Sequence, residues 1–205
     1  MKRLCLSVGL SLVGPAPLLA LTFDRCDQAQ MAFATAAVHG ARDIALASAA
    51  AVGDTPQFAR WFGRYSPAAA ETVRAGMKAV DRALRNDELQ LVCPALGEDG
   101  CDEGTYANVL SDQPYRVNVC AAFFTQPTMG SVTPDSRAFD SGTREGTLIH
   151  EISHFDVVAA TDDNCYTRTV CSATAKTDPD LALRNADSFQ YYAEDVVLSR
   201  LGRIE

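Results

Sequence analysis

Apolar residues recur at roughly helical spacing through the first third of the chain. From Cys26 to about Ala51 the sequence is rich in alanine and contains no proline. This pattern predicts a long first helix, whose regularly placed apolar residues include Met31, Ala34, Val38, Ile44 and Leu46. The turn-forming run at residues 53–56, Gly-Asp-Thr-Pro, ends that helix.

A second helical segment follows a short apolar piece at residues 58–62. Ser66 and Pro67 are typical of a helix N-terminus, where serine caps free backbone N–H groups and proline fits the first turn. The helix that they begin extends to about Arg85. The first third is therefore predicted to be a helical hairpin.

The pattern changes after Asn86, where β-branched and aromatic residues gather in short runs. We interpret Leu89–Cys93 and Tyr115–Phe124 as strands of a small sheet, because turn-forming glycines and a proline separate them. The part from Val117 to Phe124 has two interpretations. It is either an edge strand to which a peptide backbone adds, or a plain core strand.

Helical patterns return in the last third of the chain. Residues 141–147 lead into a helix that carries the polar stretch 146–166, and Asp178 and Pro179 begin another helical region that reaches Gly202. These elements predict an α+β fold. With 205 residues and no repeat or low-complexity linker, one domain is expected.

The first twenty residues have the features of a secretory signal: Lys2 and Arg3, an apolar run over residues 4–13, and a small-residue segment that ends at Ala20. The apolar run is too short and too broken by glycine and proline for a membrane-spanning helix of about 20 residues. We therefore expect a signal peptide at 1–20, a domain at 21–205, and a secreted or extracellular protein, with the periplasm as the other possible location.

Net charge narrows the range of partners. Without Lys2 and Arg3, 16 of the 18 basic side chains remain against 26 acidic ones, a net charge of −10. Such a surface repels nucleic acid and anionic membranes. We expect no nucleic-acid partner, no stable membrane association, and a monomer.

Loss of the signal also removes Cys5 and leaves six cysteines. An even number in an exported chain indicates three disulfides, although six cysteines allow 15 pairings and the pattern does not choose among them. Zinc ligation by cysteine is disfavoured because the chain has no Cys-x-x-Cys pair. The six are Cys26, Cys93, Cys101, Cys120, Cys165 and Cys171.

The polar stretch contains the motif H-E-x-x-H at residues 150–154. On a helix, residues four apart share one face, so His150 and His154 can bind one zinc ion while Glu151 lies beside it. The alternative is a surface helix with two solvated histidines.

A catalytic zinc needs a third protein ligand. His39 is the one other histidine and lies far upstream in the alanine-rich segment, where an ordinary surface position is expected. Asp156 projects from the wrong side of the helix. The residues alone leave three candidates for the third ligand: Asp162, Asp163 and Glu194.

The run from Gly146 to Phe155, with Thr161, Asp163 and Tyr166 after it, resembles the aspzincin metallopeptidases, the deuterolysins and peptidyl-Lys metalloendopeptidases. The resemblance implies a zincin-like domain with Asp163 as third ligand and Tyr166 as a catalytic residue. It extends to segments at residues 61–65, 119–124 and 185–187. It also implies the disulfides Cys26–Cys93 and Cys101–Cys120, which leave Cys165 and Cys171 to pair.

Two positions depart from the family pattern. Ala160 replaces a glycine, and a left-handed backbone there would cost alanine about 1 kcal/mol. In lysine-specific members an acidic pocket binds the residue after the cut. Here Asp187 supplies one acid of that pocket, while Gln190 stands where those members have glutamate. A basic or mixed preference is therefore expected.

The predicted chemistry is peptide hydrolysis by zinc-activated water. Glu151 would act as general base, and Tyr166 would donate a hydrogen bond to the oxyanion. The sequence thus predicts a zinc-dependent endopeptidase with one Zn²⁺ per chain and protein or peptide substrates. Two alternatives remain open: a zinc peptidase that uses Glu194 as a ligand, and a non-catalytic zinc-binding or adhesive module.

Overall fold

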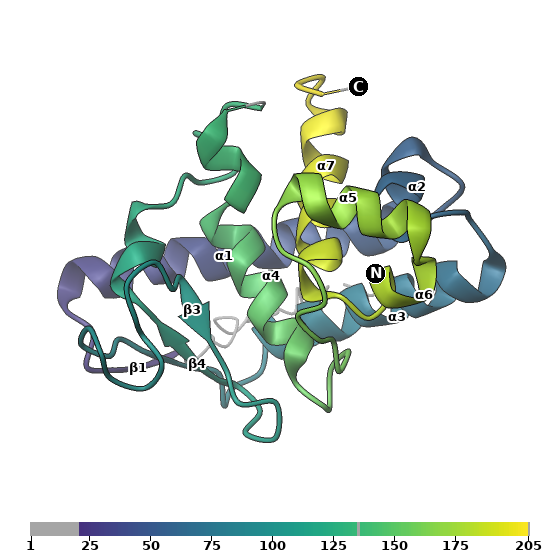
Figure 1. The fold of residues 1–205 in the computed structure, drawn as a ribbon. Coiled ribbons are helices and arrows are strands. Elements are labelled where there is room, and N and C mark those ends of the chain that lie inside the picture. The colour runs from purple at the N-terminus through teal and green to yellow at the C-terminus, as the bar shows by residue number, and fades with distance from the viewer. Residues whose placement is uncertain (1–20, 135, 205) are drawn as a thin grey trace, which may run out of the picture.

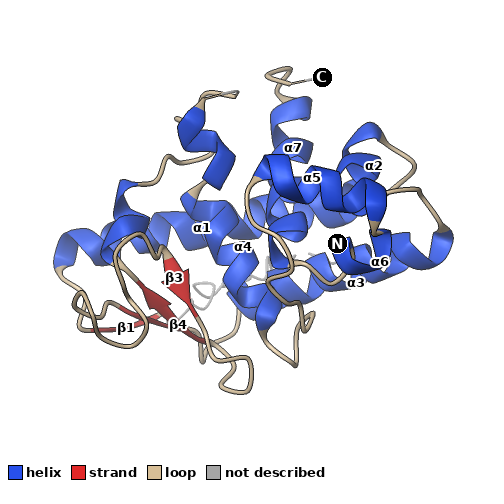
Figure 2. Ribbon diagram, viewed as in Figure 1, coloured by secondary structure: helices blue, strands red, loops and turns tan. Residues whose placement is uncertain are grey.

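The computed structural model describes residues 21–134 and 136–204, so the predicted signal peptide lies outside the described residues. The described part is a mixed α+β fold (Figure 2). Its helices and strands follow one another in this order: β1 (Thr22–Asp24), α1 (Gln28–Ala51), α2 (Pro56–Phe62), α3 (Pro67–Leu84), β2 (Gln90–Val92), β3 (Ala107–Asn108), β4 (Arg116–Val119), α4 (Arg144–His154), α5 (Arg168–Thr177), α6 (Pro179–Ala182) and α7 (Ala186–Arg200).

The first third contains the expected pair of long helices, α1 and α3, which pack against each other. Asp27 begins α1 with a capping box, in which its side chain and that of Gln30 each accept a backbone N–H of the other residue. The Ser66 side chain caps α3, with Pro67 in the first turn, as the sequence predicted. Local capping signals therefore determined where these helices begin.

The described strands form one four-stranded sheet in the order β1-β2-β4-β3. β1, β2 and β4 are parallel, and β3 is antiparallel to β4. β4 is therefore an inner strand, so the interpretation of Val117–Phe124 as an edge strand is wrong, and β3 forms the edge beside it. The predicted strand is also too long, because residues 121–125 form a 3₁₀ helix. A short apolar run without alternation does not distinguish strand from helix.

Helix α5 was not predicted, and the predicted helical region from Asp178 to Gly202 is interrupted. Residues 183–185 separate α6 from α7, and Asn185, the residue before α7, is fully buried. The Asn185 side chain accepts hydrogen bonds from the backbone N–H groups of Asn164 and Cys165. This break ties the start of α7 to the loop that follows α4.

Helix α4 runs through the middle of the molecule, with the sheet on one side and α5 and α6 on the other (Figure 1). It packs against α7 and α1, and α7 is buried over most of its length. Gly146 permits this packing, because a Cβ there would lie 2.1 Å from Glu194 Oε1 on α7. No helix of the described residues is long and apolar enough to cross a membrane.

Three disulfides join the described cysteines. They pair Cys26 with Cys93, Cys101 with Cys120, and Cys165 with Cys171, which are the pairs that the family resemblance implied. The first joins the residues that directly follow β1 and β2. The third joins Cys165, in the loop before α5, to Cys171 in the first turn of α5. Such bonds fit an oxidising compartment outside the cytosol.

Candidate metal centre

The H-E-x-x-H motif occupies the last two turns of α4. Thr143 caps the helix, and its hydroxyl accepts a hydrogen bond from the N–H of Gly146 at 3.1 Å. Four-residue spacing brings the rings of His150 and His154 to 4.8 Å between centroids. His150 is buried and Glu151, next to it, is also buried. The alternative of two solvated histidines on a surface helix is therefore wrong.

Asp163 reaches the two imidazoles from the loop after α4. Its Oδ1 lies 3.1 Å from Nε2 of His150 and 3.4 Å from Nε2 of His154. Each of the three residues thus offers a ligand atom, and these atoms all lie within 4.8 Å of one another. Two imidazole nitrogens and a carboxylate oxygen are ligands that suit zinc, so the donor set fits this metal.

The turn that directs Asp163 inward depends on Ala160 and Thr161. Ala160 has φ of +48°, the left-handed conformation considered for this position, which costs a non-glycine residue about 1–2 kcal/mol. The Thr161 hydroxyl meets that of Ser153 at 2.6 Å, and the Thr161 N–H donates to the Ser153 carbonyl at 3.2 Å. These contacts hold the loop against α4 in spite of the strained residue.

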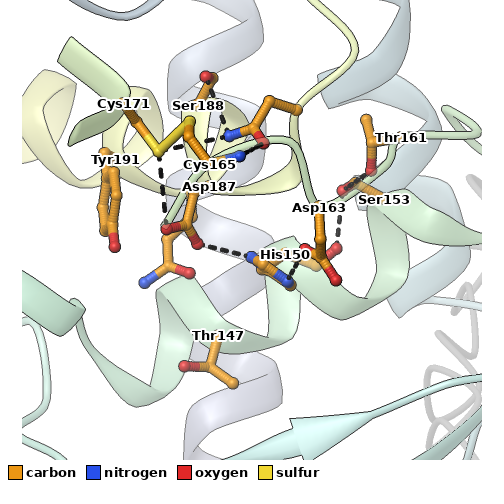
Figure 3. Close-up of polar contacts among 12 residues, drawn as sticks. Thr147, His150, Ser153, Thr161, Asp163, Cys165, Cys171, Asp187, Ser188 and Tyr191 are labelled. Carbon is orange, nitrogen blue, oxygen red and sulfur yellow. Dashed lines mark hydrogen bonds and ion pairs between the residues drawn. A yellow bond between two sulfur atoms is a disulfide. The ribbon is translucent and has the colours of Figure 1, made fainter. Parts of the chain in front are cut away.

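A second hydrogen bond orients each histidine. Nδ1 of His150 lies 2.8 Å from Oδ1 of Asp187, and Nδ1 of His154 lies 2.7 Å from the Thr161 carbonyl oxygen. Both Nδ1 atoms therefore carry hydrogen, and both Nε2 atoms lie near Oδ1 of Asp163. Figure 3 shows His150 between Asp187 and Asp163. An acceptor on the far nitrogen is the usual support of a metal-binding histidine.

The other candidate ligands lie elsewhere. The backbone of Asp162 pairs with residues 184–186, and its side chain is exposed. Glu194 is fully buried and forms an ion pair with Arg168 and hydrogen bonds with Thr143. The interpretation of Glu194 as a zinc ligand is therefore wrong. His39 is exposed on α1, as expected.

The electrostatics of the cluster follow from burial and close pairing. Burial opposes protonation of His150, but its hydrogen bonds with Asp163 and Asp187 outweigh this and raise its pKa to about 10. Burial likewise opposes ionisation of Asp163, yet the two imidazoles hold its pKa well below the usual range. The carboxylates of the cluster thus stabilise a positive charge on His150, whose Nε2 faces Asp163.

Glu151 and Tyr166 face the same cleft, which has a volume of about 490 Å³. Burial raises the pKa of Glu151, although the neighbouring histidines oppose this. Tyr166 is 57% exposed, and burial of its hydroxyl together with the charge of Asp163 raises its pKa. A carboxylate that gains affinity for protons and a hydroxyl that retains its proton are suited to general base and hydrogen-bond donor, respectively.

The structure gives Asp187 a place that the sequence did not indicate. Its Oδ1 meets Nδ1 of His150, and its Oδ2 accepts the N–H of Thr167 at 3.0 Å. Asp187 therefore supports His150 and the loop beside Tyr166 at once. This contact joins residues 37 positions apart, so no local pattern could have revealed it. Gln190 lies one turn further along α7 and also lines the cleft.

Residues 47–194 match the model of the aspzincin M35 family, which is described as lysine-specific metallo-endopeptidase. The solved structure of a zinc peptidase from Grifola frondosa is similar to this chain, with a TM-score of 0.70 and 26% identity. The similarity covers 83% of this chain and 97% of that one.

Two relatives show sequence similarity over much of the chain. An extracellular protease of Aeromonas hydrophila is 36% identical over 175 residues, which are 83% of this chain and 46% of that protein. A peptidyl-Lys metalloendopeptidase of Pleurotus ostreatus is 32% identical over 142 residues, 69% of this chain and 74% of that protein. The chain thus spans about half the length of the first of these relatives and about three quarters of the second.

Proposed function

This chain belongs to the aspzincin M35 family, and on that premise we propose that it is a zinc-dependent endopeptidase. The observation that carries the proposal is the convergence of His150, His154 and Asp163 in a cleft that Glu151 and Tyr166 also line. We further propose that Asp163 is the third ligand and that one zinc ion binds per chain. Both relatives named above are proteases, which supports this activity.

Zinc, when bound, supplies Lewis-acid chemistry, because it acidifies water and polarises a carbonyl group. Glu151 accepts the proton of the attacking water and passes it to the leaving amine. Its raised pKa suits the first step, since a carboxylate that holds a proton more firmly is a better base. The second step proceeds because the leaving amine is more basic than a carboxylate. The buried position of Glu151 keeps the transferred proton away from bulk solvent.

The Tyr166 hydroxyl donates a hydrogen bond to the oxyanion that forms from the scissile carbonyl. Its exposed position at the mouth of the cleft suits contact with a bound chain, and its raised pKa keeps the proton on the hydroxyl. The Cys165–Cys171 bond and the contact of the Thr167 N–H with Asp187 hold the segment that carries it. Loss of such a donor typically lowers the rate about a hundredfold or more.

The substrate backbone has an available edge at β3, whose residues and neighbours Tyr106–Val109 line the cleft. We propose that an extended peptide adds to this edge, because β3 pairs with β4 on one side and leaves the other side unpaired within the described sheet. Protein or peptide chains are thus the proposed substrates. The three disulfides and the extracellular relative support action outside the cytosol after removal of residues 1–20.

The decisive test is Glu151→Gln. We expect this variant to bind zinc in the same ratio as wild type, while its hydrolysis of a casein or peptide-library substrate falls by about a thousandfold or more. Glu88→Gln, at an exposed position, is the matched control and should retain full activity. Persistence of wild-type hydrolysis in Glu151→Gln, or its persistence after complete removal of metal by a chelator, would contradict the proposal. A zinc-binding protein without turnover would show no hydrolysis in either form.

A further inference from the structure

Tyr166 and Thr167 lie in a short loop that a disulfide closes. The bond joins Cys165 to Cys171, and Figure 3 shows it beside Asp187. Inside this loop Thr167 has φ of +68° and ψ of 149°. We propose that the Cys165–Cys171 bond positions Tyr166 in the cleft by holding the backbone of Thr167 in this conformation. The inference rests on the proposed endopeptidase function, in which the Tyr166 hydroxyl contacts the reacting carbonyl.

The backbone conformation of Thr167 is unfavourable. A positive φ combined with a ψ near 150° is a region that essentially only glycine occupies, and the branched Cβ of threonine makes it an outlier there. Such a conformation persists only where the surrounding structure over-determines it. Rotation about the N–Cα bond of Thr167 toward a negative φ would relieve the strain, and it would turn Tyr166 relative to helix α5.

Hydrogen bonds and ion pairs hold the chain on both sides of Thr167. The Cys165 N–H donates to Asn185 Oδ1 at 3.0 Å, and the Thr167 N–H donates to Asp187 Oδ2 at 3.0 Å. The Arg168 guanidinium forms ion pairs with two carboxylates of α7. Each hydrogen bond contributes only modestly, and the long side chain of Arg168 can follow a movement of its backbone. These contacts alone therefore leave Thr167 able to relax.

The disulfide supplies the constraint that the weaker contacts lack. Cys165 and Cys171 are both buried, and the fully buried Asn185 contacts both, because its Nδ2 lies 3.6 Å from Cys171 Sγ. The bond ties the residue before Tyr166 to the first turn of α5. The loop therefore cannot open, and the rotation that would relax Thr167 is blocked.

Packing does not hold the Tyr166 side chain in place. Tyr166 is more than half exposed, and so is Val170 in the same loop. A side chain with few buried contacts depends on its backbone for its direction. The proposed ligands His150, His154 and Asp163 lie outside the loop. Opening the loop should therefore move Tyr166 and leave the proposed zinc site intact.

The first test removes the bond. For zinc-loaded Cys165→Ala/Cys171→Ala we expect kcat with a peptide substrate to fall by about a hundredfold at nearly unchanged KM, the loss typical of a missing oxyanion donor. Its zinc affinity should equal that of wild type. Cys26→Ala/Cys93→Ala opens the disulfide beside β1 and β2, and this control should keep the wild-type kcat. A wild-type kcat in Cys165→Ala/Cys171→Ala would overturn the inference and leave the proposed endopeptidase function intact.

A double-mutant cycle with Tyr166→Phe distinguishes positioning from general damage. Tyr166→Phe should lower kcat by about a hundredfold in wild type and hardly at all in Cys165→Ala/Cys171→Ala, because the hydroxyl is already misplaced there. In the Cys26→Ala/Cys93→Ala background the full loss should remain. Equal losses in all three backgrounds would mean that the disulfide does not act through Tyr166, which overturns the inference.

Glycine at position 167 should reverse the loss, because glycine adopts a positive φ without strain. In the Cys165→Ala/Cys171→Ala background we expect Thr167→Gly to raise kcat by about tenfold or more. Thr167→Ser keeps both the hydroxyl that caps α5 and a side chain at the strained position, so it should not restore the rate. Restoration by neither variant, or by both alike, would contradict a role for the Thr167 conformation.

Hydrogen exchange provides a measurement that needs neither zinc nor turnover. The Thr167 amide donates to the buried Asp187 carboxylate, so it should exchange slowly in the chelated wild-type chain. It should exchange at least about tenfold faster in Cys165→Ala/Cys171→Ala, and addition of Thr167→Gly should slow it again. An unchanged exchange rate would overturn the inference. Absence of hydrolysis by the wild-type chain would overturn the proposed function and, with it, the contact of Tyr166 with a substrate.

Discussion

Helix α7 carries two buried acidic clusters, and they have opposite roles. The metal-side cluster joins Asp187 to His150 and to the backbone of Thr167. The arginine cluster lies two turns further on, where Glu194 and Asp195 both contact Arg168. Both clusters connect α7 to the segment after Tyr166, and their buried carboxylates look alike in sequence.

The two clusters differ in the cationic side chain that their carboxylates contact. Arg168 keeps its charge at any ordinary pH, and its guanidinium also lies over the ring of Phe139 at 3.5 Å from the ring centroid. Its ion pairs with Glu194 and Asp195 therefore persist at any ordinary pH. The cation of the metal-side cluster is an imidazole that can lose its proton, and its second nitrogen faces Asp163. A buried acid becomes part of a metal site when its partner can exchange a proton for a metal ion.

The largest effect should come from removing the cation of the arginine cluster. Arg168→Met would leave Glu194 and Asp195 buried without their partner, a change that typically costs about 3–5 kcal/mol of folding free energy. Denaturant unfolding of the zinc-loaded chain measures this cost. Arg64→Met, at an exposed position, is the control. Equal midpoints for the two variants would mean that the arginine cluster does not contribute to stability.

The metal-side cluster should instead make stability depend on pH when metal is removed. The pKa of His150 is raised from 6.5 to about 10 in the folded chain, so its contribution is fully present below pH 6.5. It is lost as the pH rises toward 10. We expect the chelated protein to lose roughly a few kcal/mol across this window, on the rule of about 1.4 kcal/mol per pKa unit.

Unfolding of the chelated protein at several pH values between 6 and 10 measures this effect. Arg168→Met should show the same slope at lower overall stability, because Arg168 does not titrate in this range. A flat profile for the chelated wild-type chain would contradict the assignment of a raised pKa to His150.

A smaller and more specific effect is expected from Asp187→Asn. Loss of the charge behind His150 should weaken zinc binding by about 10- to 100-fold, while the unfolding midpoint of the chelated protein changes less than in Arg168→Met. Competition with a fluorescent zinc chelator gives the affinity. Asp162→Asn, at an exposed neighbouring position, should bind zinc like wild type. Unchanged affinity in Asp187→Asn would remove Asp187 from the support of the metal.

The sequence predicted those parts of the structure that depend on local signals. Apolar spacing predicted α1, the Ser66–Pro67 signal predicted the start of α3, and four-residue spacing brings His150 and His154 together. The capping box of Asp27 was not predicted. Helix α5 was missed because it is short, rich in threonine, serine and alanine, and buries only Cys171 and Ala175, so no run of large apolar residues marks it. The short strands β1 and β3 depend on distant pairing partners, so their residues alone gave no signal.

The candidate site, like the fold, was predictable only where local sequence signals define it. A resemblance indicated Asp163, but only the folded loop reveals how Thr161 and Ser153 direct it toward the histidines. The different roles of Asp187 and Glu194 could not be inferred from spacing, because each depends on a contact with α4 or α5 across the fold. Long-range contacts place Asp187 behind a histidine of the proposed zinc site and pair Glu194 with Arg168.

The two glycines beside Gln190 restrict how this protein can diverge. A Cβ at position 142 would strike the Gln190 amide, and a Cβ at Gly146 would lie 2.9 Å from Gln190 Cγ. A saturation library should therefore tolerate only glycine at 142 and 146, because a side chain at either position would displace that of Gln190. The loop before α4, the first turn of α4 and the second turn of α7 can therefore change only together, because each fills space that the others leave.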